Sequence, residues 1–408
     1  MQINLDHNKK YLLACSYGPD SMALFSLLLK GNYNFSVAHI NYGLRGEESE
    51  KETNDLALYC KEHNIAFFVK WVNGKKIKGN FQNEARKVRY EFFEEIIKEH
   101  DFDALLTAHH ADDVIETYLM QQNSKRETFY YGIREEIVLN NFLVIRPLLN
   151  YYKNDLVFYC VEHKVPFAVD SSNLELTYTR NKIRHNLVKK MSVEQKDKLL
   201  LDIKGRNKDL KAMTNKLELL LENSTISITE FIKLNNREQQ HLLYMLFHNK
   251  GIADKFSKGR NNQIKDVVLS DKNSAMIKVI DSYYLVKYED KFSLININNY
   301  QPYKYIVETP ETIKTPQFVA FFGKNNVFPN IPASEYPLTI ATQGKNQKYK
   351  IKGYEKTINR LFIDMKMPRH YRLIWPVVTN KNGEVIYVPR YRANYIPKAT
   401  DLFKIYIK

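Results

Sequence analysis

Residues 11–30 read YLLACSYGPDSMALFSLLLK, which is an apolar run of strand length, a short polar loop and a second apolar run with helical spacing. The loop consists of Ser16-Tyr17-Gly18-Pro19-Asp20-Ser21. The helix is expected over residues 22–30. A strand, a tight loop and a helix N-terminus form a cradle for phosphate, because backbone N–H groups and the positive end of the helix face the anion. The alternative is an ordinary strand–helix turn in which serine and aspartate cap the helix.

The same alternation continues along the chain. Apolar runs at 35–41, 65–72 and 103–108 are each followed by a segment with helical spacing, over 48–64, 81–99 and 111–122. Repeated β-α units predict an α/β fold with a parallel sheet and helices on both faces. Ligands bind beyond the C-terminal ends of such strands. The loops that start at Ser16, Asn41 and His109 are therefore expected at one rim of the sheet.

Composition predicts further domains after this α/β domain, to which we assign residues 1–190. Residues 191–300 begin with a long, polar, lysine-rich linker helix and are predicted to form a mainly helical domain. Six of the 13 prolines lie within 301–337, which indicates a proline-rich connection. Residues 338–408 alternate β-branched and aromatic residues with Lys and Arg, and they predict a small, basic, β-rich domain.

The positive charge is concentrated towards the C-terminal end. Of the formal net charge of +15, none falls within 1–200, +4 falls within 201–300 and +11 within 301–408. A neutral first half and a strongly basic last quarter favour a catalytic domain followed by a surface that docks nucleic acid. The alternative is a basic surface that only faces solvent.

The composition excludes several classes of protein. With 44% apolar residues among 408, the chain has enough apolar material for a core, so a disordered chain is excluded. It lacks the run of about 18 apolar residues needed to cross a bilayer. Cys15, Cys60 and Cys160 never form a C-x-x-C pair, which argues against a disulfide framework, a zinc site or an iron–sulfur cluster. We expect a cytoplasmic protein with three reduced thiols.

A second polar cluster, TAHHADDVIET at 107–117, starts at a strand end and enters a helix. Asp113 and Glu116 are three residues apart and share one face of that helix. Two such carboxylates bind a cation, either Mg²⁺ or the ammonium of a substrate amine. The alternative is capping of the helix by Asp112 and Asp113, which leaves His109-His110 and Glu116 without a role. The adjacent histidines, together with these carboxylates, leave a transition-metal site as a further alternative.

The loop at 16–21 resembles the Ser-Gly-Gly-x-Asp-Ser loop of the N-type ATP pyrophosphatases, the PP-loop superfamily. This resemblance implies a Rossmann-like fold and cleavage of ATP between its α- and β-phosphates, with AMP passed to an acceptor oxygen. Tyr17 stands where the superfamily pattern has its first glycine. If that position needs a positive φ, tyrosine carries a strain of roughly 1–2 kcal/mol.

Three more segments extend the resemblance to the tRNA(Ile)-lysidine synthetase family. They are AHINYGLRGEES at 38–49, NFQNEARKVRYEFF at 80–93, and DSSN at 170–173 followed by YTRNKIRHNL at 178–187. In the tail, IKG at 351–353, Phe362, Arg372 and PVV at 376–378 are similar to the family's tRNA-contacting C-terminal domain. The combination D-x-S-N…Y-x-R-N-x-I-R is not shared by the superfamily at large.

This resemblance implies a two-step ligation on the wobble cytidine of the isoleucine tRNA with a CAU anticodon. The cytidine O2 first attacks the α-phosphate of ATP and releases pyrophosphate. The ε-amine of free L-lysine then displaces AMP from C2 and forms lysidine, so that the tRNA reads AUA. ATP as a substrate and Mg²⁺ are implied, because Mg²⁺ stabilises the charge that moves onto pyrophosphate.

The resemblance also assigns roles to residues of this sequence. The ATP site is expected to comprise Ser16, Tyr17, Gly18, Pro19, Asp20, Ser21, His39, His109 and Asp112, with Asp20 and Asp112 on the metal. The catalytic residues are expected to be Asp113, Glu116, Asp20 and Arg180, and the lysine substrate is expected to contact Asp113, Glu116 and Arg184. The tRNA is expected to contact Arg86, Arg89, Lys352, Arg369 and Arg372. Asp113 is the candidate base for the attacking amine, whose solution pKa is about 10.4.

Two other functions stay open from the sequence. A tRNA thiolase would use the same ATP chemistry, but it normally needs paired cysteines, which this chain lacks. A catalytically silent tRNA-binding protein with a decayed ATP site is suggested by Tyr17. The sequence leaves the oligomeric state open, a homodimer included.

Overall fold

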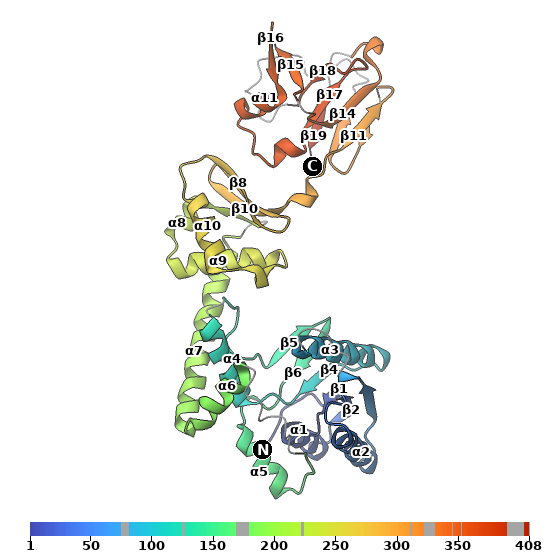
Figure 1. Cartoon of the computed structure of the whole chain (residues 1–408), viewed down its shortest axis with the longest axis vertical. Helices are drawn as coiled ribbons and strands as arrows, with labels where there is room; N and C mark the ends of the chain where they lie inside the picture. Colours follow the sequence, from blue (N-terminus) through green and yellow to red (C-terminus); the bar gives the residue numbers. More distant parts are fainter. Residues whose placement is uncertain are drawn as a thin grey trace. The chain divides into compact units, whose positions relative to one another are not determined.

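The computed structural model describes residues 1–74, 81–124, 127–168, 179–221, 224–310, 312–321, 331–344, 346–351, 353–389 and 404–407. The chain forms two compact units, Met1–Ala212 and Met213–Lys408. The first runs from blue to green in Figure 1, and the second continues to red. Within the described ranges, no helix combines the length and the apolar character that crossing a membrane requires.

The first unit is built around a six-stranded sheet with the order β3-β2-β1-β4-β6-β5. Its strands are β1 (Lys10–Ala14), β2 (Asn34–Asn41), β3 (Phe67–Trp71), β4 (Ala104–Thr107), β5 (Glu136–Leu139) and β6 (Phe142–Ile145). Only β5, at one edge, pairs antiparallel. The inner strand β4 reads ALLT and is buried throughout, as a strand covered on both faces must be.

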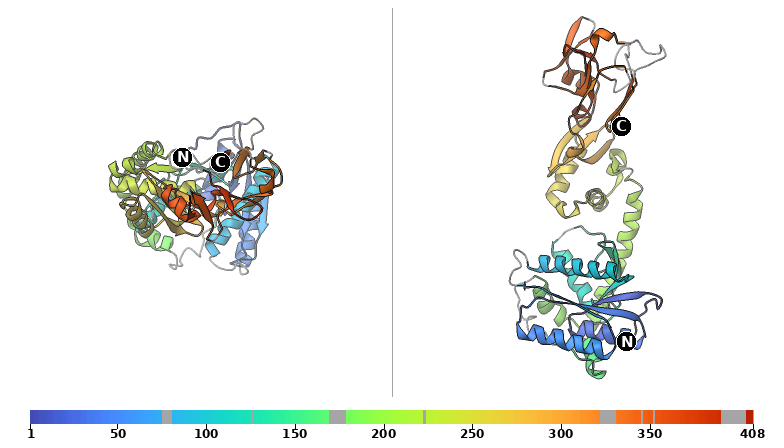
Figure 2. Two further views of the ribbon diagram at one scale, coloured as in Figure 1. Left: turned by 90° about the horizontal axis from the view of Figure 1, so that it is seen from above. Right: turned by 90° about the vertical axis from the view of Figure 1, so that its right-hand side faces the viewer.

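Helices cover both faces of this sheet (Figure 2), which confirms the predicted α/β fold. They include α1 (Pro19–Lys30), α2 (Glu47–Glu62), α3 (Phe81–Glu99) and α5 (Lys153–Glu162). The helix α4 (Ala111–Ser124) follows β4 and packs against later helices. Leu13 of β1 packs with apolar residues of α1, α2 and α5, whereas Leu12 packs with those of α3. Successive strand residues point to opposite faces, so one strand contributes to both cores.

Two further helices, α6 (Thr179–Asn186) and α7 (Val193–Glu218), surround α4. Ile115 of α4 shares a buried cluster with Ile183 of α6, and Val114 shares another with Ile203 of α7. The loops after β1, β2 and β4 leave parallel strands at their carboxyl ends and therefore share one rim, as predicted. The packing around α4 brings α6 and the first turns of α7 to that rim.

The described residues of the second unit form three sheets with the orders β7-β10-β9-β8, β11-β14-β17-β18-β15-β16 and β12-β13-β19. The first sheet consists of β7 (Thr225–Ser227), β8 (Ser274–Ile280), β9 (Tyr283–Tyr288) and β10 (Lys291–Asn296), and it accompanies α8 (Ile228–Lys233), α9 (Asn236–Asn249) and α10 (Lys258–Val268). The remaining strands are β11 (Lys304–Val307), β12 (Ile313–Lys314), β13 (Phe318–Phe321), β14 (Leu338–Thr342), β15 (Lys348–Ile351), β16 (Tyr354–Thr357), β17 (Pro376–Thr379), β18 (Val385–Tyr387) and β19 (Lys404–Ile407), with the helix α11 (Ile358–Asp364). The predicted β-rich character of the C-terminal region is confirmed.

Residues 301–337 differ from the proline-rich connection that we expected, because the part of this range that the structure describes carries three strands. Of these, β11 pairs with β14, and β13 pairs with β19. The prolines stand between the strands: Pro302 precedes β11, Pro316 separates β12 from β13, and Pro337 precedes β14. Proline lacks the N–H that a ladder uses, so a proline cluster marks the ends of short strands as readily as it marks a linker.

Candidate active site

The hydroxyl of Ser21 holds the loop after β1. Its Oγ donates to the C=O of Gly18 at 2.9 Å and accepts from the N–H of Ser16 at 3.2 Å. Gly18 is the N-cap of α1, and Pro19 lies in the first turn, where its missing N–H is not needed. The helix therefore begins at Pro19, earlier than the expected start at Met22. Its positive N-terminus lies at the rim of the sheet.

Tyr17 adopts the left-handed backbone conformation, with φ 64°, so the condition under which the sequence implied backbone strain is met. Its ring is only 7% exposed and belongs to the core that also contains Leu13. The backbone is fixed as well, because the N–H of Ala168 donates to the C=O of Tyr17 at 2.9 Å. Burial of the ring offsets the backbone strain, so the loop keeps a left-handed residue without glycine.

We expect Tyr17→Gly to destabilise the protein by about 1–4 kcal/mol. Glycine relieves a strain of about 1–2 kcal/mol, but removal of a buried aromatic ring costs about 3–5 kcal/mol. Urea unfolding of the two proteins measures the difference. Tyr17→Phe keeps the ring and is the control, which should stay within about 1.5 kcal/mol of the parent. A glycine variant more stable than the parent would show that strain outweighs packing.

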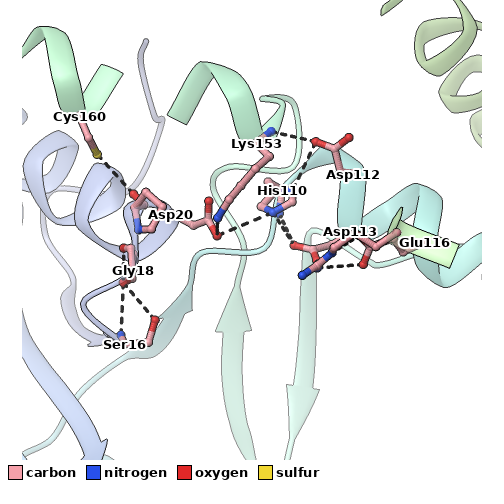
Figure 3. Close-up of polar contacts among 12 residues, drawn as sticks. Ser16, Gly18, Asp20, His110, Asp112, Asp113, Glu116, Lys153 and Cys160 are labelled. Atoms are coloured by element: carbon pink, nitrogen blue, oxygen red, sulfur yellow. Dashed lines mark hydrogen bonds and ion pairs between the residues drawn. The ribbon is translucent and has the colours of Figure 1, made fainter. Parts of the chain in front are cut away.

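Asp20 and Asp112 each face the side chain of a lysine. Nζ of Lys153 lies 2.5 Å from Oδ2 of Asp20 (Figure 3). The backbone N–H of Lys153 donates to Oδ2 of Asp112 at 2.8 Å. Nζ of Lys196 lies 2.5 Å from Oδ1 of Asp112. Residues from α1, α4, α5 and α7 therefore meet at the rim.

The ring of His110 lies among the acidic side chains. Its Nε2 is 3.8 Å from Oδ2 of Asp20 and 3.4 Å from Oδ2 of Asp113. Its Nδ1 is 3.7 Å from Oδ2 of Asp112 and has no hydrogen-bond partner among the described residues. The side chain is 5% exposed. His110, for which the sequence suggested only a transition-metal site, thus lies between Asp20 of the phosphate loop and the carboxylates of α4.

Asp113 and Glu116 lie together, as predicted, and both contact arginines of α6. Arg180 donates from Nη2 to Oδ1 of Asp113 at 2.6 Å and from Nε to Oε2 of Glu116 at 2.8 Å. Arg184 donates from Nε to Oε1 of Glu116 at 2.5 Å. Burial by itself raises the pKa of Asp113, but the charges of His110 and Arg180 outweigh it and lower that pKa. Asp113 is therefore ionised at neutral pH.

His109 is held in its neutral form. Its Nδ1 lies 2.9 Å from the hydroxyl oxygen of Thr107. Burial lowers the pKa of His109 to about 4, and the positive charges of Arg146 and Arg180 act in the same direction, whereas Asp113 opposes them. A neutral imidazole can donate or accept a hydrogen bond at the rim.

We expect this histidine to make stability depend on pH between about 6.5 and 4. The unfolded chain binds a proton on His109 below about 6.5, whereas the folded protein binds it only near a pKa of about 4. Stability is therefore fully present above the unfolded value and is lost on acidification, by up to about 1.4 kcal/mol per pH unit. Thermal unfolding of the parent and of His109→Asn from pH 7.5 to 4 measures it.

The variant should lose less stability on acidification than the parent. This comparison is needed because burial also lowers the pKa of His370, in the second unit, to about 4. An identical acid sensitivity of the two proteins would contradict the assignment to His109.

His39, which was expected at the nucleotide, has a protein partner on each ring nitrogen. Nδ1 lies 2.9 Å from the C=O of Cys15, and Nε2 lies 3.1 Å from Oγ1 of Thr53. Burial lowers the pKa of His39, so the ring is neutral. His39 therefore connects the loop after β1 to α2 by hydrogen bonds.

The arginines expected to contact tRNA lie in both units. Arg86 and Arg89 are exposed on α3. Arg369 is exposed in the second unit, whereas Arg372 is half-buried and its Nε donates to a backbone C=O at 2.9 Å. Lys352 lies outside the described residues.

Three basic residues at or near the rim were missed by the sequence reasoning, namely Lys153, Lys196 and Arg146. Arg146 is buried and follows β6 directly, beside the end of β4. Its position immediately after the apolar run FLVI is a signal that could have found it. No such signal marks the two lysines. Lys153 begins α5 and Lys196 lies in α7, and each is remote in sequence from the aspartate that it contacts. The DSSN motif at 170–173 lies outside the described residues.

Comparison with known proteins places this chain in a family. The family described as a PP-loop domain matches residues 1–191. A tRNA(Ile)-lysidine synthase from Mycoplasma mycoides subsp. mycoides SC is 30% identical over 401 residues, which cover 94% of this chain and 97% of that protein. The protein of the same name from Bacillus subtilis is 29% identical, with 93% of this chain and 89% of that protein covered. With similarity over nearly the full length of both chains, this chain belongs to the tRNA(Ile)-lysidine synthase family.

Proposed function

We propose that this chain is an ATP-dependent ligase that joins free L-lysine to the wobble cytidine of the isoleucine tRNA with a CAU anticodon. The observation that carries the proposal is the buried carboxylate pair of Asp113 and Glu116, which two arginines hold at the same rim as the phosphate loop. The pair offers negative charge to a substrate ammonium. His110 lies between this pair and Asp20 of the loop.

The proposed reaction has two steps. Cytidine O2 forms a bond to the α-phosphorus of ATP while the bond to the β-phosphate oxygen breaks and pyrophosphate leaves. The ε-amine of lysine then forms a bond to C2, the C2–O2 bond breaks, AMP leaves and the amine releases a proton. The loop 16–21 and the N-terminus of α1 support the phosphates. Ionised Asp113 is the candidate acceptor of the proton.

Mg²⁺ fits the carboxylates at the rim. Among the described residues, no group of three or more His, Cys, Asp or Glu side chains gathers as a complete metal site. Mg²⁺ with a nucleotide needs only one or two carboxylates, since phosphates and water fill the rest. Asp20 and Asp112 provide them, and Oδ1 of Asp20 is buried without a partner among these residues. When bound, the metal neutralises charge on the phosphates.

The lysine substrate has to exchange partners with the arginines. Arg180 and Arg184 already neutralise Asp113 and Glu116, so an incoming ammonium replaces a guanidinium on these carboxylates. The released guanidinium can then pair with the substrate carboxylate or with phosphate, in the planar two-point geometry that arginine favours. This exchange keeps every buried charge paired, as desolvated charges require.

Incorporation of labelled L-lysine into an unmodified isoleucine tRNA transcript with a CAU anticodon tests the proposal. We expect labelling only when ATP is present. A transcript with uridine at the wobble position is the matched control and should stay unlabelled, because it lacks the cytidine that is modified. Binding of the tRNA without ATP-dependent labelling would instead favour a catalytically silent tRNA-binding protein.

A further inference from the structure

Among the described residues, the four carboxylates of the candidate site at the rim each have a basic partner. Asp20 pairs with Lys153, Asp112 with Lys196, and Asp113 and Glu116 with Arg180 and Arg184, all at 2.5–2.8 Å. The formal charges of these eight side chains cancel. The arginines belong to the lysine site proposed above, whereas the two lysine side chains have no role in it.

Lys153 bridges two of the loops at the rim. Its ammonium contacts Asp20 of the phosphate loop, while its backbone N–H donates to Asp112 at the start of α4. The side chain is 40% exposed. An ammonium has three N–H donors, and the structure records one acceptor for this one among the described residues. Donors therefore remain for a ligand at the loop.

Lys196 reaches the same place from α7. Its side chain is 13% exposed. Its Nζ lies 5.3 Å from the centre of the ring of Tyr152, the residue that precedes Lys153. Leu199 and Leu200, on the following turn of α7, pack against the buried cluster of α4. This packing fixes the first turns of α7 against α4 and so holds Lys196 beside Asp112. The buried ring of His110, with its unpartnered Nδ1, completes the polar surroundings.

We propose that Lys153 and Lys196 are ATP-binding residues whose ammonium groups stand in for the metal on Asp20 and Asp112 until the nucleotide arrives. Without ATP, the two ammonium groups keep the carboxylates paired and oppose the binding of a free divalent cation. With ATP and its metal bound, Asp20 and Asp112 would hold the metal, and the ammonium groups of Lys153 and Lys196 would turn to phosphate oxygens. Each buried charge again keeps a partner of opposite sign. This inference rests on the magnesium part of the proposed function.

Two binding measurements on the full chain, neither of which uses tRNA or lysine, test it. Titration calorimetry measures the affinity for ATP with Mg²⁺, and electron paramagnetic resonance of Mn²⁺ measures metal binding without nucleotide. We expect Lys153→Met and Lys196→Met each to weaken ATP binding about tenfold or more, since each loses a charge-assisted contact. We expect the same variants to bind Mn²⁺ alone severalfold more tightly, because a carboxylate is no longer neutralised.

The matched control is Lys198→Met, an exposed lysine on the same helix, which should change neither affinity. Lys153→Arg keeps the positive charge and should keep Mn²⁺ binding weak. If the lysines only held the carboxylates in place, the methionine variants would bind Mn²⁺ more weakly, and that sign would overturn the inference. Unchanged ATP affinity would overturn it as well. Absence of Mn²⁺ binding in every protein, even with ATP, would refute the magnesium proposal together with this inference.

Discussion

We expect Asp113→Asn to release pyrophosphate from ATP in the presence of tRNA but to transfer lysine at least about 100-fold more slowly than the parent. Asparagine keeps the shape of the side chain and can still accept from Arg180, so the fold of α4 and α6 should persist. It removes the negative charge that a substrate ammonium needs and the oxygen that could accept its proton. Separate assays of pyrophosphate release and of labelled lysine on tRNA distinguish the two steps.

A second carboxylate of the same unit is the control for this result. Asp209 is exposed on α7, and Asp209→Asn makes the same chemical change away from the rim. Both steps should proceed at the parent rate in this variant. If Asp113→Asn instead lost pyrophosphate release and lysine transfer equally, Asp113 would belong to the ATP step and the assignment to the lysine site would be wrong.

We expect the triple variant Lys350→Gln, Lys366→Gln and Arg369→Gln to bind tRNA about 10- to 100-fold more weakly at about 0.1 M salt. All three side chains are exposed in the second unit, within the region that carries a net charge of +11. Each phosphate contact that is lost should reduce the slope of log affinity against log salt concentration by about 0.7–0.9. Filter binding of the CAU isoleucine tRNA over a range of salt concentrations measures both quantities.

The matched control removes three positive charges from the first unit. Lys51, Lys61 and Lys164 are exposed, and their replacement by glutamine changes the net charge by the same amount. This control should alter affinity and salt slope far less. Equal effects of the two triple variants would mean that net charge, and not a basic docking surface near the C-terminal end, governs the binding of tRNA.

The sequence predicted those features of the structure that depend on residues close together in the chain. The alternation of apolar runs over 11–122 predicted the parallel sheet and the shared rim, because strand direction and strand–helix connections follow from that order. The spacing of Asp113 and Glu116 predicted their common face, which a helix of 3.6 residues per turn dictates. The positive φ of Tyr17, in contrast, was only a conditional expectation from the sequence and was decided by the structure.

Local pattern was a poorer guide in the second half of the chain. Prolines within 301–337 indicated a connection, but β11, β12 and β13 lie between them. Two of these strands find their partners far along the sequence, β11 in β14 and β13 in β19. Strands of two to four residues contain too few alternating positions for the pattern to identify them.

The sequence by itself determined which chemical groups this protein brings to its rim, namely a phosphate loop and two carboxylates on one helix face. It also determined that the excess positive charge lies towards the C-terminal end. Only the tertiary structure decided how those groups are paired. Lys153 reaches Asp20 from α5, Lys196 reaches Asp112 from α7, and Arg180 closes over Asp113 from α6. A motif specifies side chains and their local spacing. Which charges meet depends on how helices distant in sequence pack around α4, and the cost of leaving a buried charge unpaired then requires that each finds a partner.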